Sequence, residues 1–270
     1  MRKVAAAVAA TSKTAAILAI GIIVLATIYI AYRYEFSPNA LVIVEPRQHE
    51  LLKYVIDNFD ATMDKSWDLY VFHGKTSQAY AKYATEAVKG RKVFLIPLQT
   101  DNLNAAQYNE LFKSPNFWSQ VWAENILVFQ TDTAICKGSK FKISDFMKYD
   151  YIGCAGGKDV YGKGAYWGGV EKKYSFYGVG GLSFRKKSFM NKCIAARPGI
   201  KPLYAEDVFF SECLESFGVK PESAEVLNNF CSQNSFHAES FGAHKTKNMT
   251  REDKKRFHAY CPVSQALEVA

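Results

Sequence analysis

The segment Trp67-Asp-Leu-Tyr-Val-Phe72 decides the fold, because a helical segment at 77–88 follows it and leads into a second apolar run, Lys92-Val-Phe-Leu-Ile-Pro97. Short runs rich in β-branched and aromatic residues, bounded by turn residues, are typical of buried strands. The pattern continues outward, with Leu41-Val-Ile-Val44 before this unit and Ile126-Leu-Val-Phe129 after it. Strands that alternate with helices predict a parallel sheet covered by helices.

Four segments between the predicted strands have helical character. Arg47 to Phe59 places apolar residues at helical spacing, and Ser77 is suited to cap the helix that Gly90 ends. Ala105 to Phe112 and Asn116 to Trp122 are aromatic-rich helical pieces. Because no change in composition divides residues 40–260, we expect one α/β domain with a mixed, mainly parallel sheet.

The composition of the 270-residue chain excludes several classes of protein. With 49% hydrophobic and 22% charged residues, it is globular rather than disordered or collagen-like. Its net charge of +8 owes four positive charges to Arg2, Lys3, Lys13 and Arg33, and from residue 34 onward 30 basic residues face 26 acidic ones. This even balance argues against a nucleic-acid-binding protein.

An uncharged apolar run, Thr14 to Tyr32, predicts a transmembrane helix. As a helix, its 19 residues span roughly 28 Å, close to the hydrocarbon thickness of about 30 Å. The alternative is a cleaved signal peptide, which has a shorter apolar region and a small-residue cleavage site that this run lacks. By the positive-inside rule, residues 1–13 are cytosolic and, beyond a linker at 33–39, the domain is luminal or extracytoplasmic, as in a single-pass type II membrane protein.

All six cysteines follow the apolar run, which fits an oxidising compartment. They allow up to three disulfides, whose pairing the sequence does not give, and the alternative is buried free thiols. Asn248-Met-Thr250 is an N-glycosylation acceptor pattern. Residues 261–270 are predicted to form a C-terminal tail.

Candidate site residues follow the predicted strands, because ligands of parallel sheets bind beyond the carboxyl ends of the strands. Glu45, or a group near Asp101, is expected to orient a nucleotide. The carboxylate of Asp132 can hold a divalent cation against a diphosphate, and the alternative is that it caps a turn. His244 is a candidate imidazole ligand, although a lone histidine near the end of a chain is usually not one.

The second half of the chain differs from the first in its glycine and aromatic content. Ten of the 17 glycines fall between Gly153 and Gly181, interleaved with tyrosines and a tryptophan. Such a segment suits a loop that closes over a sugar, and the alternative is a surface loop with ordinary packing aromatics. Glu206 and Asp207 open a predicted helix, where acidic residues also serve to favour the helix dipole. Sequence motifs of P-loop, α/β-hydrolase and zinc-protease enzymes are absent from the sequence.

Five motifs occur in order along the chain: Ile126-Leu-Val-Phe-Gln-Thr-Asp-Thr133, Ile143 to Gly153, Gly180-Gly-Leu-Ser-Phe-Arg185, Glu206-Asp-Val-Phe-Phe210 and Phe241-Gly-Ala-His-Lys245. This order resembles a family of domains of unknown function that look like GT-A glycosyltransferases and occur in bacteria, algae and large DNA viruses. The resemblance covers roughly residues 40–247. It implies one Rossmann-like GT-A domain, a nucleotide-sugar donor and a Mn²⁺ or Mg²⁺ cofactor.

The resemblance also implies roles for individual residues. Gln130-Thr-Asp132 stands where related folds carry an Asp-x-Asp metal motif, of which only the second acid is present, and His244 matches a metal or diphosphate contact. Glu206 and Asp207 occupy the place of the base that deprotonates the acceptor hydroxyl. The donor or acceptor floor is expected to contain Gly180, Gly181 and Ser183. Departures from the family pattern at Val179, Cys154-Ala155 and Thr246 affect acceptor contacts more than the fold.

Three functions follow from these observations. The leading prediction is a type II membrane glycosyltransferase that moves a sugar from a nucleotide-sugar donor to a glycan, protein or lipid acceptor, with no nucleic-acid partner. The alternative is a membrane-anchored domain of the same fold that binds a glycan or a protein partner without turnover. A structural envelope glycoprotein is the third. Metal-dependent hydrolysis of a nucleotide sugar separates the first from the other two.

Overall fold

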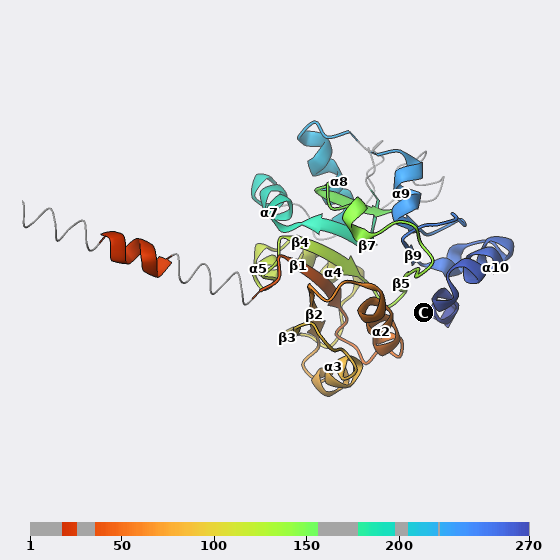
Figure 1. Ribbon diagram of the computed structural model, residues 1–270, viewed down its shortest axis with the longest axis horizontal. Helices are drawn as coiled ribbons and strands as arrows, with labels where there is room; N and C mark the ends of the chain where they lie inside the picture. Colours follow the sequence, from red (N-terminus) through yellow and green to blue (C-terminus); the bar gives the residue numbers. More distant parts are fainter. Residues whose placement is uncertain (1–17, 26–35, 156–177, 198–204, 221, 270) are drawn as a thin grey trace, which may run out of the picture.

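The computed structural model describes residues 18–25, 36–155, 178–197, 205–220 and 222–269. Of the predicted transmembrane run 14–32, the described part is residues 18–25, which are helical and expose their large apolar side chains (Figure 1). Within the described ranges, no helix combines the length and the apolar character that crossing a membrane requires. The middle of the glycine-rich segment, residues 156–177, lies outside the described residues.

A six-stranded mixed sheet forms the centre of the domain, in the order β3-β2-β1-β4-β7-β6. The predicted strands are present and pair in parallel as β3 (Val93–Pro97), β2 (Trp67–His73), β1 (Asn39–Val44) and β4 (Asn125–Phe129). The chain then reverses, so that β7 (Val179–Lys186) lies antiparallel to β4 and β6 (Tyr151–Cys154) antiparallel to β7. The α/β class and the mixed, mainly parallel sheet are therefore confirmed.

Alternate residues of the central strands build two hydrophobic cores, one on each face of the sheet, because successive side chains of a strand point to opposite faces. On one face, Leu41 and Val71 pack with helices α2 (Leu52–Thr62), α3 (Gln78–Thr85) and α9 (Ala224–Phe230). On the other face, Val42 and Phe72 pack with α4 (Ala105–Phe112), α5 (Pro115–Ser119), α7 (Lys187–Ala196) and α8 (Glu206–Ser216). Both faces of the sheet are thus covered.

Helix α2 begins at Leu52, five residues later than its apolar spacing predicts. The carboxylate of Glu45 accepts hydrogen bonds from the backbone N–H of Arg47 and from its guanidinium. The ring of His49 accepts a hydrogen bond from the backbone N–H of Leu51. These contacts hold residues 45–51 as a loop, which begins directly after the carboxyl end of β1.

A second, three-stranded sheet extends the domain in the order β5-β9-β8. It consists of β5 (Thr133–Ile135), β9 (Gly242–His244) and β8 (Cys231–Ser232). The 3-10 helix η1 (Ile143–Asp145) lies between β5 and β6 in the sequence. The 3-10 helix η2 (Thr246–Asn248) and helix α10 (Arg251–Tyr260) follow β9. Because β5 follows β4 after three residues, this small sheet brings the late strand β9 to the carboxyl end of β4.

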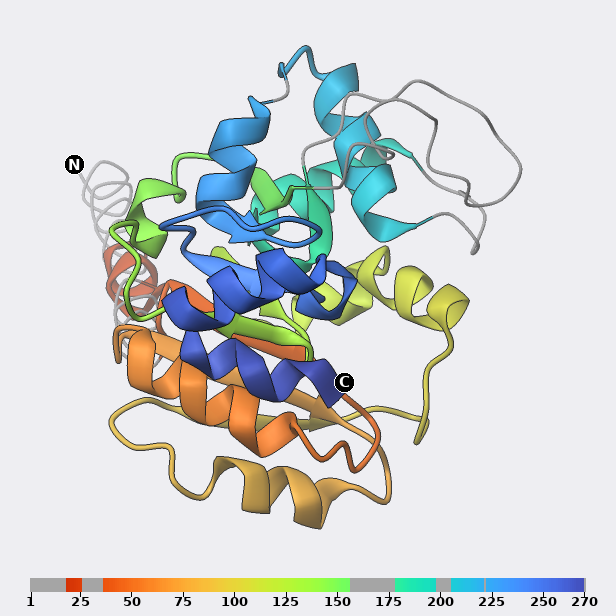
Figure 2. The same cartoon turned by 90° about the vertical axis from the view of Figure 1, so that its right-hand side faces the viewer.

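The C-terminal segment is part of the domain rather than a tail. Helix η3 (Pro262–Val269) buries Leu267 in the same core as Leu41, and the hydroxyl of Tyr54 in α2 donates a hydrogen bond to the carbonyl of Val263. Figure 2 shows the C-terminal helices beside α2. The packed domain therefore extends past residue 260, where the sequence predicts its end.

All six cysteines pair, which realises the predicted maximum of three disulfides. Cys136 pairs with Cys261, Cys154 with Cys231, and Cys193 with Cys213. The first joins the residue after β5 to the residue after α10, the second joins β6 to β8, and the third joins α7 to α8. The second bond therefore ties the small sheet to the central one.

Candidate active site

Two adjoining cavities of about 320 and 460 Å³ open beyond the carboxyl ends of β1 and β4. They share Leu103, Tyr108, Gln130 and Lys245 in their linings, so they form one continuous cleft. The smaller cavity is further lined by Val44, Glu45, Pro46, Arg47, His49, Asn102, Thr131 and Asp132. The larger one includes Asn109, Gly180, Gly181, Glu206, Asp207, Gln233 and His244. The cleft thus lies where the sequence predicts ligands to bind.

Asp132 and His244 meet at the junction of the two cavities. Asp132 follows β4 and His244 ends β9, and their Oδ1 and Nε2 atoms lie 3.4 Å apart. Both atoms are buried, and neither has a hydrogen-bond partner among the described residues. Burial raises the pKa of Asp132, but the positive charge of His244 in its protonated form and the ammonium of Lys245 lower it more. The pKa of this carboxyl therefore lies below its ordinary value, and the group is ionised at neutral pH.

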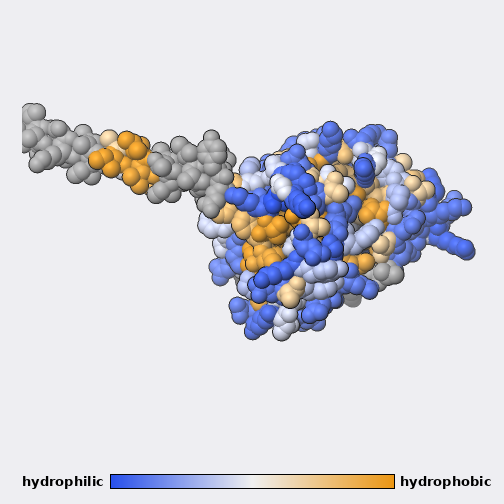
Figure 3. Space-filling view, turned by 60° about the horizontal axis from the view of Figure 1, so that its bottom comes forward, coloured by the Kyte–Doolittle hydropathy of each residue, from blue (hydrophilic) through white to orange (hydrophobic). Residues whose placement is uncertain are grey.

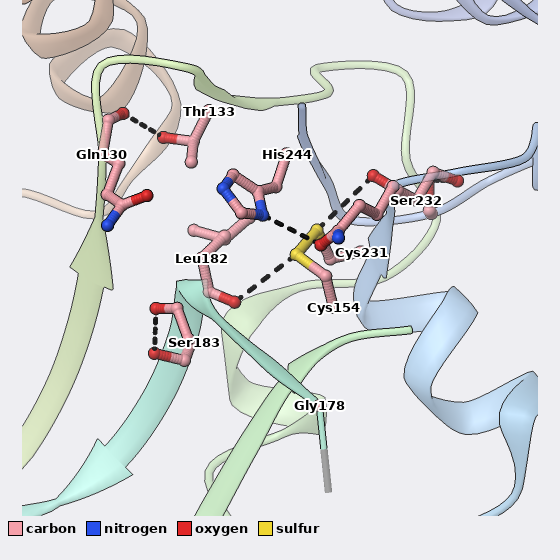
Figure 4. The surroundings of a disulfide bond; sticks show 12 residues. Gln130, Thr133, Cys154, Gly178, Leu182, Ser183, Cys231, Ser232 and His244 are labelled. Atoms are coloured by element: carbon pink, nitrogen blue, oxygen red, sulfur yellow. Dashed lines mark hydrogen bonds between the residues drawn. A yellow bond between two sulfur atoms is a disulfide. The ribbon is translucent and has the colours of Figure 1, made fainter. Parts of the chain in front are cut away.

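Gln233 fixes which nitrogen of His244 faces Asp132. The Oε1 atom of Gln233 accepts a hydrogen bond from Nδ1 of His244 at 2.9 Å, and both side chains are buried. When the imidazole is neutral and its proton is on Nδ1, Nε2 carries the lone pair that a metal ion would bind. Figure 4 shows His244 beside the disulfide between Cys154 and Cys231, which lies two residues before Gln233. The disulfide thereby ties the segment that orients the imidazole to strand β6.

Gly181 allows the imidazole of His244 to pack against strand β7. A methyl group at this position would overlap Nε2 of the imidazole, and one at Gly180 would overlap the carboxylate of Glu206. Both glycines line the larger cavity. Glycine is therefore required at both positions, because the side chains of His244 and Glu206 pack directly against the backbone of β7.

A cation fits this pair of residues. A carboxylate oxygen and an imidazole nitrogen are ordinary ligands of divalent metals, and a separation of 3.4 Å suits two ligands of one ion. The described residues hold no cluster of three or more histidine, cysteine or acidic side chains that could bind a metal. A cation held by Asp132 and His244 would therefore take its remaining ligands from substrate oxygens or water.

Glu206 forms a buried ion pair rather than a free carboxylate. Its two oxygens accept hydrogen bonds from Nη1 and Nη2 of Arg185 at 2.6 and 2.9 Å. The guanidinium is fully buried between the rings of Phe112 and Tyr151, each 5.1 Å from its Cζ atom. Because Glu206 is the neutralising partner of this charge, it is not available to accept a substrate proton.

Asp207, the next residue, has a different environment. Its Oδ2 atom accepts a hydrogen bond from the backbone N–H of Gly180 at 3.2 Å, and the half-buried carboxylate lines the larger cavity. Burial, together with the negative charge of Glu206, raises the pKa of Asp207 to about 6. A carboxylate with this pKa is ionised at neutral pH and is a stronger base than an ordinary aspartate.

The structure gives Ser183 and Asp101 places outside the cleft lining. Ser183 is fully buried within β7, where its hydroxyl donates to the carbonyl of Gly180 and accepts from Nε of Arg185. It supports the ion pair instead of lining a ligand floor. Asp101 is exposed and accepts a hydrogen bond from the backbone N–H of Thr76, so it holds a loop beside the smaller cavity.

Comparison with known proteins identifies the family. The profile of a family described as "Protein of unknown function (DUF5672)" matches residues 93–244, more than half of the chain. The chain belongs to the DUF5672 family. The matched part of this DUF5672 domain runs from β3 to β9 and so includes Asp132, Asp207 and His244. No curated protein matches the chain.

A solved structure is similar to this DUF5672 domain in fold. It is the apo structure of the bifunctional glycosyltransferase WbbM, with a TM-score of 0.51 and 10% sequence identity. The similarity covers 85% of this chain and 51% of the other, so the chain spans about half the length of that glycosyltransferase. An α/β domain with a glycosyltransferase-like fold is thereby supported.

Several residues that line the cleft of this DUF5672 domain are not among those that the sequence predicts. Tyr108 lines both cavities, yet on the sequence it is one of many aromatic residues in a helical segment. Gln233 carries no motif of its own. Lys245, which adjoins His244, also lines both cavities and has a left-handed backbone with φ of 50°. A lysine held in that unfavourable conformation beside a histidine is the kind of strain found at functional sites.

Proposed function

We propose that this protein is a nucleotide-sugar-dependent glycosyltransferase of the GT-A type, anchored in a membrane by residues 14–32. The observation that carries the proposal is the pair of buried atoms, Oδ1 of Asp132 and Nε2 of His244, which lie 3.4 Å apart with no hydrogen bond to the rest of the described residues, in a cleft that also contains Asp207. The glycosyltransferase-like fold supports the same function.

Different parts of the cleft suit the nucleoside, the diphosphate and the sugar of such a donor. The smaller cavity, lined by Glu45, Arg47 and His49, supplies polar groups for a nucleoside. Lys245 lies in both cavities, where its ammonium can bind the diphosphate. When bound, a divalent cation held by Asp132 and His244 supplies positive charge next to the departing diphosphate. The larger cavity then accommodates the sugar and the acceptor hydroxyl.

Asp207 is the residue that we assign to proton transfer. In an inverting transfer, the acceptor oxygen forms a bond to the anomeric carbon while the bond from that carbon to the diphosphate oxygen breaks. The acceptor hydroxyl loses its proton, which a carboxylate of the cavity accepts. Asp207 is ionised at neutral pH and lines this cavity, whereas the charge of Glu206 is used by Arg185.

The membrane anchor and the luminal location of the domain are part of the proposal. The uncharged run at 14–32 follows basic residues. The three disulfides fit an oxidising compartment such as a lumen or an extracytoplasmic space.

The deciding experiment measures hydrolysis of nucleotide sugars, screened over donors, with and without Mn²⁺. We expect the wild type to hydrolyse a donor only when Mn²⁺ is present, and Asp132→Asn to lose donor and Mn²⁺ binding while its melting temperature changes little. The amide keeps the shape of the side chain but removes the charge that holds a cation. If no donor is bound or hydrolysed under any condition, the domain binds a glycan or a partner without turnover.

A further inference from the structure

Three aromatic side chains form a partly exposed cluster where the chain enters the domain. The ring of Phe36 stacks between Trp122 and Phe94, with ring centroids 5.2 and 5.9 Å away. Trp122 is 47% exposed, and Phe36 and Phe94 are half-buried. Figure 3 shows apolar surface, in orange, on the domain near the place where the N-terminal segment joins it. We call these three residues the aromatic patch.

The polypeptide at this entry point is fixed to the sheet. The backbone N–H of Ser37 donates a hydrogen bond to Asp68 at 3.1 Å. The carbonyl of Pro38 accepts hydrogen bonds from the backbone N–H groups of Glu124 and Asn125 at 3.0 and 2.9 Å. The aromatic patch and the start of the described domain therefore move together as one body.

The predicted transmembrane run ends close to the patch. It stops at Tyr32, four residues before Phe36, and a stretch of four residues reaches at most about 14 Å when fully extended. Residues 18–25 within the run are helical, and their large apolar side chains are 49–68% exposed, as expected for a segment that lipid would cover. A bilayer that contains this run necessarily lies within reach of Phe36.

We propose that the aromatic patch is the surface on which the domain rests against the bilayer. The contact with the bilayer depends on the proposed membrane anchor, and the class of acceptor that follows from it depends also on the proposed sugar transfer. Tryptophan is enriched at membrane–water interfaces, where the ring is partly in lipid and partly hydrated. The exposed Lys92, whose Nζ lies 5.7 Å from the ring centroid of Phe36, adds a positive charge that favours anionic head groups.

This orientation limits the class of acceptor. Strand β1 begins at Asn39, beside the patch, and ends at Val44, which lines the cleft. At about 3.3 Å per residue, β1 separates the cleft from the patch by roughly 17 Å. The patch lies at the amino ends of the parallel strands and the cleft at their carboxyl ends. The acceptor hydroxyl is therefore on a glycan or protein chain that extends away from the membrane. A lipid head group at the bilayer surface lies on the wrong side of the domain.

The test uses the full chain in vesicles of identical head groups, made with and without brominated acyl chains, which quench tryptophan fluorescence at short range. The signal of Trp122 is the difference between the wild type and Trp122→Phe. As a matched control, Tyr54→Trp in the Trp122→Phe background places a reporter in the first turn of α2, which follows the loop 45–51 at the carboxyl end of β1, and Tyr54 is 38% exposed. We expect a loss of Trp122 fluorescence in brominated vesicles and no loss from the reporter at position 54.

Each other outcome contradicts the inference. Equal Trp122 emission in both kinds of vesicle means that the patch does not touch the bilayer, and quenching at position 54 means that the cleft side faces it. A chain that does not associate with vesicles has no anchor and thus no such surface. Hydrolysis of a nucleotide sugar, measured on the same preparation, tests the transferase proposal separately.

Discussion

Glu206 and Asp207 show how two adjacent carboxylates acquire different chemistry. Neighbours on a helix project about 100° apart, so one side chain turns to Arg185 while the other lines the cleft. The guanidinium stabilises the charge of Glu206, whereas burial raises the pKa of Asp207 to about 6. The sequence places both acids at the start of a helix and leaves both as candidate bases, and the structure favours Asp207.

We expect Asp207→Asn to lower kcat on the order of 10²–10⁴-fold with little change in donor affinity. The amide keeps the size of the side chain but cannot accept the proton of the acceptor hydroxyl. Turnover and donor binding are the measurements, and Asp101→Asn, an exposed acid outside the cleft lining, is the matched control. Near-normal turnover of Asp207→Asn would place the base elsewhere.

The same pKa sets the pH dependence. As the pH falls through about 6, Asp207 becomes protonated, so kcat/KM of the wild type should fall on the acidic side. The free energy of unfolding changes in the opposite direction: it decreases as the pH rises. A carboxyl whose pKa is raised on folding destabilises the folded state at pH values above that pKa. Asp207→Asn should therefore melt at a temperature no lower than the wild type at pH 8, and a clear drop would indicate a structural role instead.

Gln233 is expected to act on metal binding through His244. Gln233→Leu removes the acceptor that keeps the proton on Nδ1, so Mn²⁺ affinity should fall roughly 10–100-fold, as for other partners of metal-binding histidines. Gln233→Glu retains an acceptor and should keep most of the affinity. Titration of Mn²⁺ by electron paramagnetic resonance gives the affinities without any turnover. Equal affinity in all three proteins would exclude this role.

At the scale of elements, the Arg185–Glu206 pair connects β7 to α8. Glu206→Ala leaves a fully buried guanidinium without its partner, and breaking a buried pair in this way typically costs about 3–5 kcal/mol. Asp57→Asn, in the partly exposed pair between Lys53 and Asp57 of α2, is the control and should cost under about 1 kcal/mol. Thermal and denaturant unfolding measure both. Similar small losses in the two variants would show that the buried pair is not required.

The strands were predictable because their signal is local. Apolar runs of four to six residues bounded by turns identify β1 to β4 without knowledge of the rest of the chain. The late start of α2 was not predictable from apolar spacing, because contacts of Glu45 with Arg47 hold the preceding residues as a loop. The pairing of the cysteines was not predictable either, since it depends on which elements lie side by side.

The candidate site was predictable in its position but not in its internal contacts. The rule that ligands bind beyond the strands pointed to Glu45 and Asp132, which line the cleft. Asp132 and His244 are brought together by the second sheet. The pairing of its short strands cannot be predicted from local sequence patterns. Ser183 was expected in the floor, but its position on β7 turns its hydroxyl inward to Arg185.

At the scale of the whole molecule, the exposed sequon at Asn248 reports on which side of a membrane the domain lies. Expressed in a eukaryotic secretory system, a luminal domain should carry one glycan at this residue, which Asn248→Gln removes. Asn234→Gln, outside any sequon, is the control. Peptide N-glycosidase treatment followed by electrophoresis gives the measurement. An unmodified chain whose domain is digested by protease in sealed vesicles would contradict the luminal location.

The docking of helix η3 determines when the domain can fold during its synthesis. Leu267 belongs to the same core as Leu41, and Cys136 forms its disulfide with Cys261, which is 125 residues later in the chain. A nascent chain emerges from its first residue onward, so the sheet is made long before the segment that covers this side of it. Until translation passes residue 267, the core beneath α2 stays open to solvent, and its exposed apolar surface is a target for chaperones. Folding should therefore finish only after this segment has been released.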